Sequence, residues 1–234
     1  MIFFTGKRNT RCATSVFNPW REAVVMPQKP KFTKEEIVEE AFNYVRKNSI
    51  NSLTARNLGK VLNSSTKPIF GYFNSMEELK IEVYKKAYEV YTQHITNGME
   101  TDEREFRGVG KGIIYFAKDE PYLFQMLFMT SSNRQYSNII ELMKQDQNYS
   151  RIINSIKKSL LVDDDKYAAE IYRGMWVLVH GIATMTATGV YQFSEEEIDT
   201  ILNRGLRGYI DFDELMKKIA KKRKEEENGR NNKN

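Results

Sequence analysis

The stretch LTARNLGKVLNSSTKPIFGYF, from Leu53 to Phe73, constrains the fold more than any other part of the chain. It contains two short segments with helical spacing of apolar residues, separated by a polar corner at residues 63–65. Asn63 tolerates the left-handed backbone conformation that a tight corner needs. Three short helices with such a corner between the second and the third are typical of a helix-turn-helix. We therefore expect the last helix to lie in a groove of another molecule rather than to complete a core.

Capping residues predict where the three short helices begin. Thr33 and Glu36 form a capping box for the first helix. Thr54 is expected to cap the second, and Ser65 or Thr66 the third. A basic, proline-containing first turn is compatible with such a start.

The apolar positions of these helices predict a small core. Asn48 is expected to end the first helix in a left-handed conformation. Val61 is expected to be buried, and Ile69, Phe70 and Phe73 are expected to form the apolar face of the third helix.

The rest of the chain has the pattern of an all-α protein. No alternation typical of a β-strand exceeds three residues, and the chain has no internal repeat. Apolar residues at three- and four-residue steps predict longer helices. These cover about 75–98, 103–118, 121–129, 165–189 and from 194 onward, with one or two more within 133–161.

Charge is unevenly distributed along the chain. Residues 26–75 carry a net charge of +4 and residues 217–234 one of +5, whereas residues 76–216 carry −7. A basic N-terminal head on an acidic body favours a polyanionic partner for the head. An ordinary solvated face accounts for the same charges equally well, so charge alone does not decide.

The N-terminal 25 residues read as a leader. The whole chain has one cysteine, Cys12, which lies in this segment; a single cysteine excludes a disulfide framework and fits a reducing cytoplasm. These 25 residues contain no apolar run long enough for a signal peptide. Met26 then opens a stretch that reads like a natural start. We expect this segment to be an over-called start or a disordered leader.

The segment 174–194 carries no formal charge over 21 residues, which is long enough to span a bilayer. It contains His180, several hydroxyl residues and Gln192, and its apolar fraction is modest. We favour a helix buried on nearly all sides over a membrane span.

Six residues around the corner are candidates for DNA contact. The first residues of the third helix would face base edges in the major groove, where hydroxyls and a lysine suit bases and phosphates. The start of the second helix offers backbone N–H groups and a guanidinium fork. The candidates are Thr54, Arg56, Ser65, Thr66, Lys67 and Tyr72. Ordinary surface charge is the alternative for Arg56 and Lys67, and core packing for Tyr72.

The stretch LTARNLGKVLNSSTKPIFGYFNSMEEL resembles the DNA-binding signature of the tetracycline-repressor (TetR) family. The matching residues are Leu53-Thr54, Leu58, Ile69, Tyr72-Phe73 and Glu77-Glu78-Leu79. Four positions depart from the pattern: Gly59 stands for Ala, Asn63 for Gly, Phe70 for Tyr and Met76 for Lys. The last two departures remove phosphate contacts that the resemblance implies, so we expect lower affinity or a smaller salt dependence.

Two further stretches, Tyr115–Met129 and Trp176–Gly189, resemble the ligand-binding half of a subgroup named for its Trp and His-Gly pair. The resemblance implies a cytoplasmic homodimer that pairs through its last two long helices. It also implies a palindromic double-stranded DNA operator, with half-sites about 34–36 Å apart, and an unknown small-molecule effector. Small residues agree with a dimer seam because they let helix axes approach. They are Ala168, Ala169, Gly181, Ala183, Ala187 and Gly189.

The implied organisation has four parts. Residues 1–28 are the leader, 29–75 the helix-turn-helix domain, 76–215 the ligand-binding and dimerisation domain, and 216–234 a basic tail. Aromatic residues of the body are candidates for the wall of an effector pocket, although residues of this kind also make ordinary core. They are Tyr91, Tyr115, Phe116, Phe124, Phe128, Trp176 and His180. For His180 we favour a buried histidine that is hydrogen-bonded within the core.

Two other classes of function stand beside a ligand-released repressor. An enzyme would need a nucleophile with a base, a phosphate-binding loop or metal-ligand spacing, and the sequence contains none of these patterns. Two histidines exclude a histidine-rich metal site, and we expect no cofactor. A helical protein-interaction module that has lost DNA binding stays open because of Phe70 and Met76.

Overall fold

The computed structural model describes residues 31–130 and 143–231, without the side chains of residues 215, 218 and 224–231. Every regular element in these ranges is a helix, which confirms the all-α fold class. All the elements below belong to one compact unit that begins at Phe32. The predicted leader, residues 1–28, lies outside the described residues.

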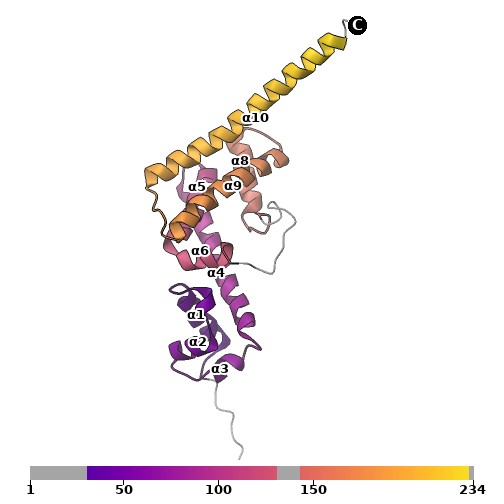
Figure 1. The fold of residues 1–234 in the computed structure, drawn as a ribbon. Helices are drawn as coiled ribbons and strands as arrows, with labels where there is room; N and C mark the ends of the chain where they lie inside the picture. Colours follow the sequence, from indigo (N-terminus) through magenta and orange to yellow (C-terminus); the bar gives the residue numbers. More distant parts are fainter. Residues whose placement is uncertain (1–30, 131–142, 232–234) are drawn as a thin grey trace, which may run out of the picture. The chain divides into compact units, whose positions relative to one another are not determined.

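Three short helices and a 3₁₀ turn form the N-terminal head of this unit (Figure 1). They are α1 (Lys34–Val45), η1 (Ile50–Ser52), α2 (Ala55–Val61) and α3 (Lys67–Phe70). The capping box is present: the Thr33 hydroxyl accepts from Glu36 N at 3.1 Å, and the Glu36 carboxylate accepts from Thr33 N at 2.8 Å. The Thr54 hydroxyl accepts from Asn57 N at 3.2 Å. Asn63 has a φ of 46°, the left-handed corner that the sequence predicts.

The head differs from the prediction at three positions, which are Asn48, Val61 and Phe70. α1 ends at Val45, and Asn48 instead donates its side-chain amide to the Tyr44 carbonyl at 2.9 Å. Val61 is 39% exposed and Phe70 is 50% exposed, so neither belongs to the core. α3 has only four residues, so it has one inward side. Ile69 and Phe73 fill that side, and Phe70 points outward.

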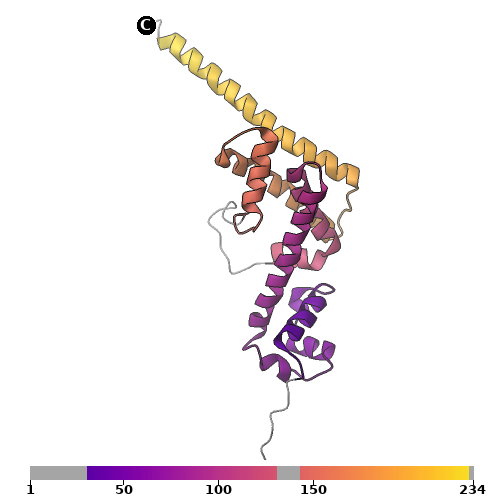
Figure 2. The same cartoon turned by 180° about the vertical axis from the view of Figure 1, so that it is seen from behind.

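One long helix, α4 (Met76–Thr101), joins the head to the body. It packs against α1 and against α5 (Glu105–Asp119), as the view from behind shows (Figure 2). α4 and α5 meet backbone to backbone at Gly98 and Gly108. A Cβ built on either glycine would collide with the carbonyl oxygen of the other. Only glycine permits this crossing, so the two helices are locked in register.

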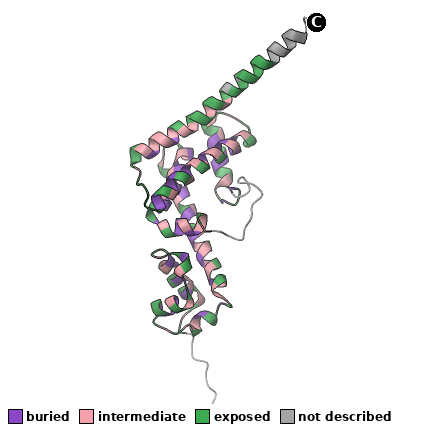
Figure 3. Ribbon diagram, in the orientation of Figure 1, coloured by how far each residue is buried: buried purple, intermediate pink, exposed green. Residues whose placement is uncertain are grey.

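The body is built around α5. Its other helices are α6 (Pro121–Phe128), α8 (Tyr149–Leu160), α9 (Asp165–Ala187) and α10 (Glu195–Asn231). α5 contacts each of them as well as α4. Burial is concentrated in α5 and α9, whereas the described residues of α10 from Arg207 to Arg223 are mostly exposed (Figure 3). α10 continues through residues 216–231 of the predicted basic tail.

α9 contains most of the uncharged stretch. None of the helices in the described ranges is both long and apolar enough to cross a bilayer. One face of α9 is buried through residues such as Met175, Val179 and Ile182. The opposite face exposes 55% of Val177 and 40% of Met185. The expected burial on nearly all sides is therefore wrong for a single chain.

Candidate nucleic-acid interface and effector region

The α2–α3 corner presents most of the predicted DNA contacts to solvent. Thr54, Arg56, Ser65 and Lys67 are exposed, and Thr66 is half-buried. Ser65, not Thr66, supports the start of α3, because its hydroxyl accepts from Lys67 N at 3.4 Å. The head thus offers hydroxyls and two cations on one short corner, which suits phosphates and base edges.

Tyr72 is used differently from what the sequence suggests. Its side chain is 36% exposed, and its hydroxyl donates to the Phe32 carbonyl at 2.9 Å. This bond ties the end of α3 to the residue that precedes the α1 cap. The hydroxyl proton is therefore engaged within the head, which leaves the oxygen as an acceptor.

Phe70 is a residue of this surface that the sequence assigned to the core. Its ring follows Lys67 by three residues, so both lie on the outer side of α3. An exposed aromatic ring in this place can contact a thymine methyl group. The signal was present in the sequence: Ile69 and Phe73 are four residues apart and already account for the inward side.

The head is fastened to the body by an ion pair. Arg46, which caps the C-terminus of α1, donates from Nε to Glu120 Oε2 at 2.9 Å and from Nη2 to Glu120 Oε1. Glu120 lies between α5 and α6 and is 6% exposed. The bond to Glu120 raises the pKa of the Arg46 guanidinium. The pair is bidentate, the geometry in which Arg and a carboxylate bind most strongly.

Six of the seven predicted pocket residues form one aromatic cluster within the body. Ring centroids of Tyr91 and Phe128 lie 5.1 Å apart, and those of Phe128 and His180 lie 4.9 Å apart. His180 stacks on Trp176 at 3.6 Å. Phe116 and Phe124 are fully buried and complete the cluster. These rings contact one another in the manner of a packed core.

Tyr115, the seventh residue, lies apart from the cluster. Its hydroxyl donates to the Glu195 carboxylate at the start of α10. Partial burial raises the pKa of the Tyr115 hydroxyl, and the hydrogen bond to Glu195 raises it further. The side chain therefore links α5 to α10.

His180 is held in its neutral form. Its Nδ1 donates to the Trp176 carbonyl at 2.9 Å, one helical turn earlier, so Nε2 carries the lone pair. Nε2 is buried and has no hydrogen-bond partner in the described part of the chain. Burial lowers the pKa of His180 to about 4. This agrees with the buried histidine that the sequence favours. No group of three metal-ligating side chains occurs within residues 31–130 and 143–231.

Asp146 is a buried carboxylate that the sequence did not single out. It is 8% exposed, and its Oδ1 accepts from Asn148 N at 2.8 Å. Its Oδ2 has no hydrogen bond with good geometry to any described residue. Burial raises the pKa of Asp146, and burial also raises those of the neighbouring Tyr91 and Tyr172 hydroxyls.

A cavity of about 60 Å³ lies elsewhere in the body, between α5, α8, α9 and α10. Among the predicted pocket residues, Trp176 lines it. Its other walls come mainly from apolar side chains such as Phe106, Val109, Met175 and Leu202.

The outer faces of α9 and α10 carry two matching stripes. Val177, Gly181 and Met185 follow one another at four-residue steps on α9, as do Gly208, Phe212 and Met216 on α10. All six are exposed, and no atom lies within 4 Å of a Cβ built on either glycine. The four alanines expected at a dimer seam are buried within the chain instead: Ala168, Ala169, Ala183 and Ala187. The prediction that these alanines lie at the dimer seam is therefore wrong. Of the small residues predicted for the seam, the glycines are the exposed ones.

Comparison with known proteins identifies the body. Residues 106–209, from α5 into α10, match the family model "Tetracyclin repressor-like, C-terminal domain". Neither a curated protein nor a solved structure matches the chain. The match lies outside the helix-turn-helix and independently confirms the family resemblance. The subgroup with the Trp and His-Gly pair stays a prediction.

Proposed function

We propose that this chain is a cytoplasmic repressor of the tetracycline-repressor family that binds a palindromic DNA operator as a homodimer. A small molecule that binds the body releases it. The observation that carries the proposal is the exposed α2–α3 corner on a head fastened to a body of that family. We assign the chain no catalytic role.

On DNA, α3 enters the major groove and α2 lies across the backbone, as in other helix-turn-helix proteins. Lys67 reaches base edges or phosphates from the first turn of α3. Arg56 grips the backbone with its guanidinium fork. Thr54 fixes the start of α2 through its bond to Asn57. Contact by Phe70 adds apolar recognition where the family pattern has a tyrosine.

The dimer forms through the exposed stripes of α9 and α10. Exposed apolar side chains beside bare glycines allow two helices to approach closely. A second copy of the chain is the partner that we propose, because an apolar stripe can pair with its own copy about a twofold axis. Two heads related by that axis would read two half-sites.

Operator binding separates this proposal from the alternative, a protein-interaction module. The short α3 and the engaged Tyr72 hydroxyl favour that alternative. The full chain is titrated against its own upstream DNA and against scrambled DNA, by fluorescence anisotropy at fixed salt. We expect Lys67→Ala to cost about 1–3 kcal/mol and to relax specificity at one base step. We expect Thr54→Val to weaken binding to both DNAs alike.

A matched control removes charge far from the corner. Lys158→Gln lies on the exposed side of α8 and should leave operator affinity unchanged. Equal affinity of the wild type for specific and scrambled DNA, with no effect of Lys67→Ala, would reject the repressor and favour the interaction module.

A further inference from the structure

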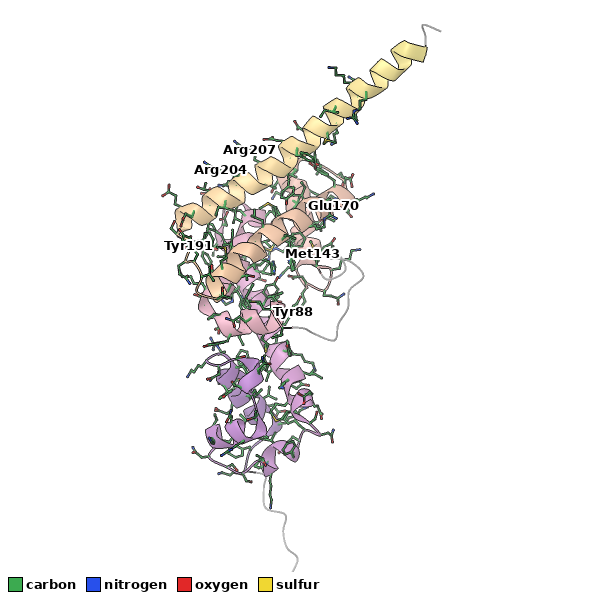
Figure 4. All side chains as sticks on the ribbon, viewed as in Figure 1. Tyr88, Met143, Glu170, Tyr191, Arg204 and Arg207 are labelled. Carbon is green, nitrogen blue, oxygen red and sulfur yellow. The ribbon has the colours of Figure 1, made fainter. Side chains whose placement is uncertain are left out.

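The cavity of the body has an opening lined by arginines. A groove of about 480 Å³ runs along α10 beside the start of α5. Arg104, Asn203 and Leu206 line both the groove and the cavity, so the two adjoin. The remaining walls of the groove are Arg204, Arg207, Ile210 and Asp211. Arg204 and Arg207 project from consecutive turns of α10 (Figure 4).

The three arginines of the groove are available for a ligand. Arg104, Arg204 and Arg207 are exposed and form no salt bridge with any residue of the described ranges. The neighbouring Arg107, by contrast, is bound to Asp102 at 2.9 Å and lies 3.6 Å from Asp199. Asp211 is the one carboxylate among the residues that line the groove.

This cluster is unusual for its surroundings. Residues 76–216 carry a net charge of −7, yet the groove gathers three arginines and a single aspartate. Guanidinium forks bind carboxylate or phosphate oxygens in a bidentate manner. The groove therefore suits an anionic head group.

The cavity suits an apolar group. Six of its walls are the side chains of Phe106, Val109, Ile113, Met175, Val179 and Leu202. Its volume of about 60 Å³ exceeds the ~10–15 Å³ that one water molecule needs and is smaller than the ~150 Å³ cavity that holds benzene. A short alkyl chain fits this space better than a ring system.

We propose that the cavity and the arginine groove together bind an amphiphilic anion, with its alkyl chain in the cavity and its carboxylate or phosphate among Arg104, Arg204 and Arg207. This proposal rests on the proposed function, because it takes the anion to be the small molecule that releases the repressor from DNA. The groove lies on the flank of α10 that carries Asn203, Arg207 and Ile210. Arg204 lies four residues before Gly208 and therefore borders the stripe of Gly208, Phe212 and Met216, whereas Asn203, Arg207 and Ile210 face away from the stripe, so this part of the groove stays open in the dimer.

Binding is measured with the full chain by the emission of Trp176, which lines the cavity. Trp20→Phe removes the second tryptophan and serves as the background for all variants. The probes are hexanoate, hexyl phosphate, hexanol and hexyltrimethylammonium. We expect saturable quenching by one or both anions, and affinities at least about tenfold weaker for the alcohol and the cation. The two anions distinguish a carboxylate from a phosphate head.

Two variants test the two halves of the site. Arg204→Gln with Arg207→Gln should weaken anion binding by about tenfold or more. The matched control, Lys158→Gln with Lys166→Gln, removes the same charge from exposed positions and should have no effect. Val109→Phe fills the cavity and should abolish quenching, with circular dichroism to establish that the variant folds.

The outcomes separate this inference from the proposed function. Operator affinity of the unliganded chain is measured in parallel. Operator binding without selective anion binding, or anion binding untouched by the arginine double variant, would overturn the anion site and leave the repressor intact. Selective anion binding that leaves operator affinity unchanged would keep the site and reject its role as effector.

Discussion

The ion pair between Arg46 and Glu120 should account for a measurable part of the stability of the folded chain. The perturbation is Arg46→Met, which keeps a stem of similar length against the Phe42 ring, over which the guanidinium lies at 5.8 Å. The change leaves Glu120, whose side chain is 7% exposed, without its bidentate partner. Its carboxylate is then buried without a cation beside it.

The magnitude follows from burial. Removing one partner of a fully buried pair costs about 3–5 kcal/mol. The Arg46 side chain is 45% exposed, so solvent screens part of the interaction, and we expect a loss of about 1.5–3 kcal/mol. Arg46→Met with Glu120→Gln removes the stranded charge and should recover more than half of that loss.

The assay is urea unfolding followed by circular dichroism, with both single variants and the double variant. The matched control is the pair of Lys86 and Glu39, which joins α4 to α1 at 2.6 Å with side chains 35% and 50% exposed. Lys86→Met should cost less than about 1 kcal/mol because that pair is largely solvated. A loss below about 0.5 kcal/mol for Arg46→Met, or no recovery in the double variant, would refute this reasoning.

Three further predictions follow from single sites. Burial lowers the pKa of His180 to about 4, so its contribution to stability is complete above the unfolded pKa of about 6.5 and is lost as the pH falls toward 4. This amounts to at most about 3 kcal/mol, and urea midpoints of wild type and His180→Gln should diverge over that window. Gly108→Val should destabilise the chain by about 3 kcal/mol or more in the same assay, because its Cβ meets the carbonyl of Gly98. Phe212→Asp should shift sedimentation from dimer to monomer, whereas Ile81→Asp, at a comparably exposed position on α4, should leave the dimer unchanged.

The local features of the fold could be predicted because each depends on a few neighbouring residues. The caps at Thr33 and Thr54 and the left-handed corner at Asn63 need only the residues around them. The third helix was harder to predict because a helix of one turn has almost no period. Only the four-residue spacing of Ile69 and Phe73 separated the inward side from the outward Phe70.

Contacts between distant segments escaped prediction. Arg46 and Glu120 are separated by 74 residues, and nothing in either neighbourhood marks the pairing. The prediction that the alanines of α9 lie at the dimer seam was wrong for a similar reason. Small residues permit close packing on any side, so composition did not tell whether α9 pairs with its own chain or with a partner. The arginine groove arises only where the start of α5 meets α10.

α5 brings these distant features together in one rigid element. Its 15 residues make a rod of about 22 Å. Phe106 and Val109 line the cavity near its start, Gly108 locks it to α4, and Glu120 directly after its end holds Arg46 of the head. Backbone contact at Gly98 leaves no side chain that could absorb a small displacement. A ligand that moves the start of α5 must therefore move α4 with it or loosen the Arg46–Glu120 pair. Either response changes how the head is held.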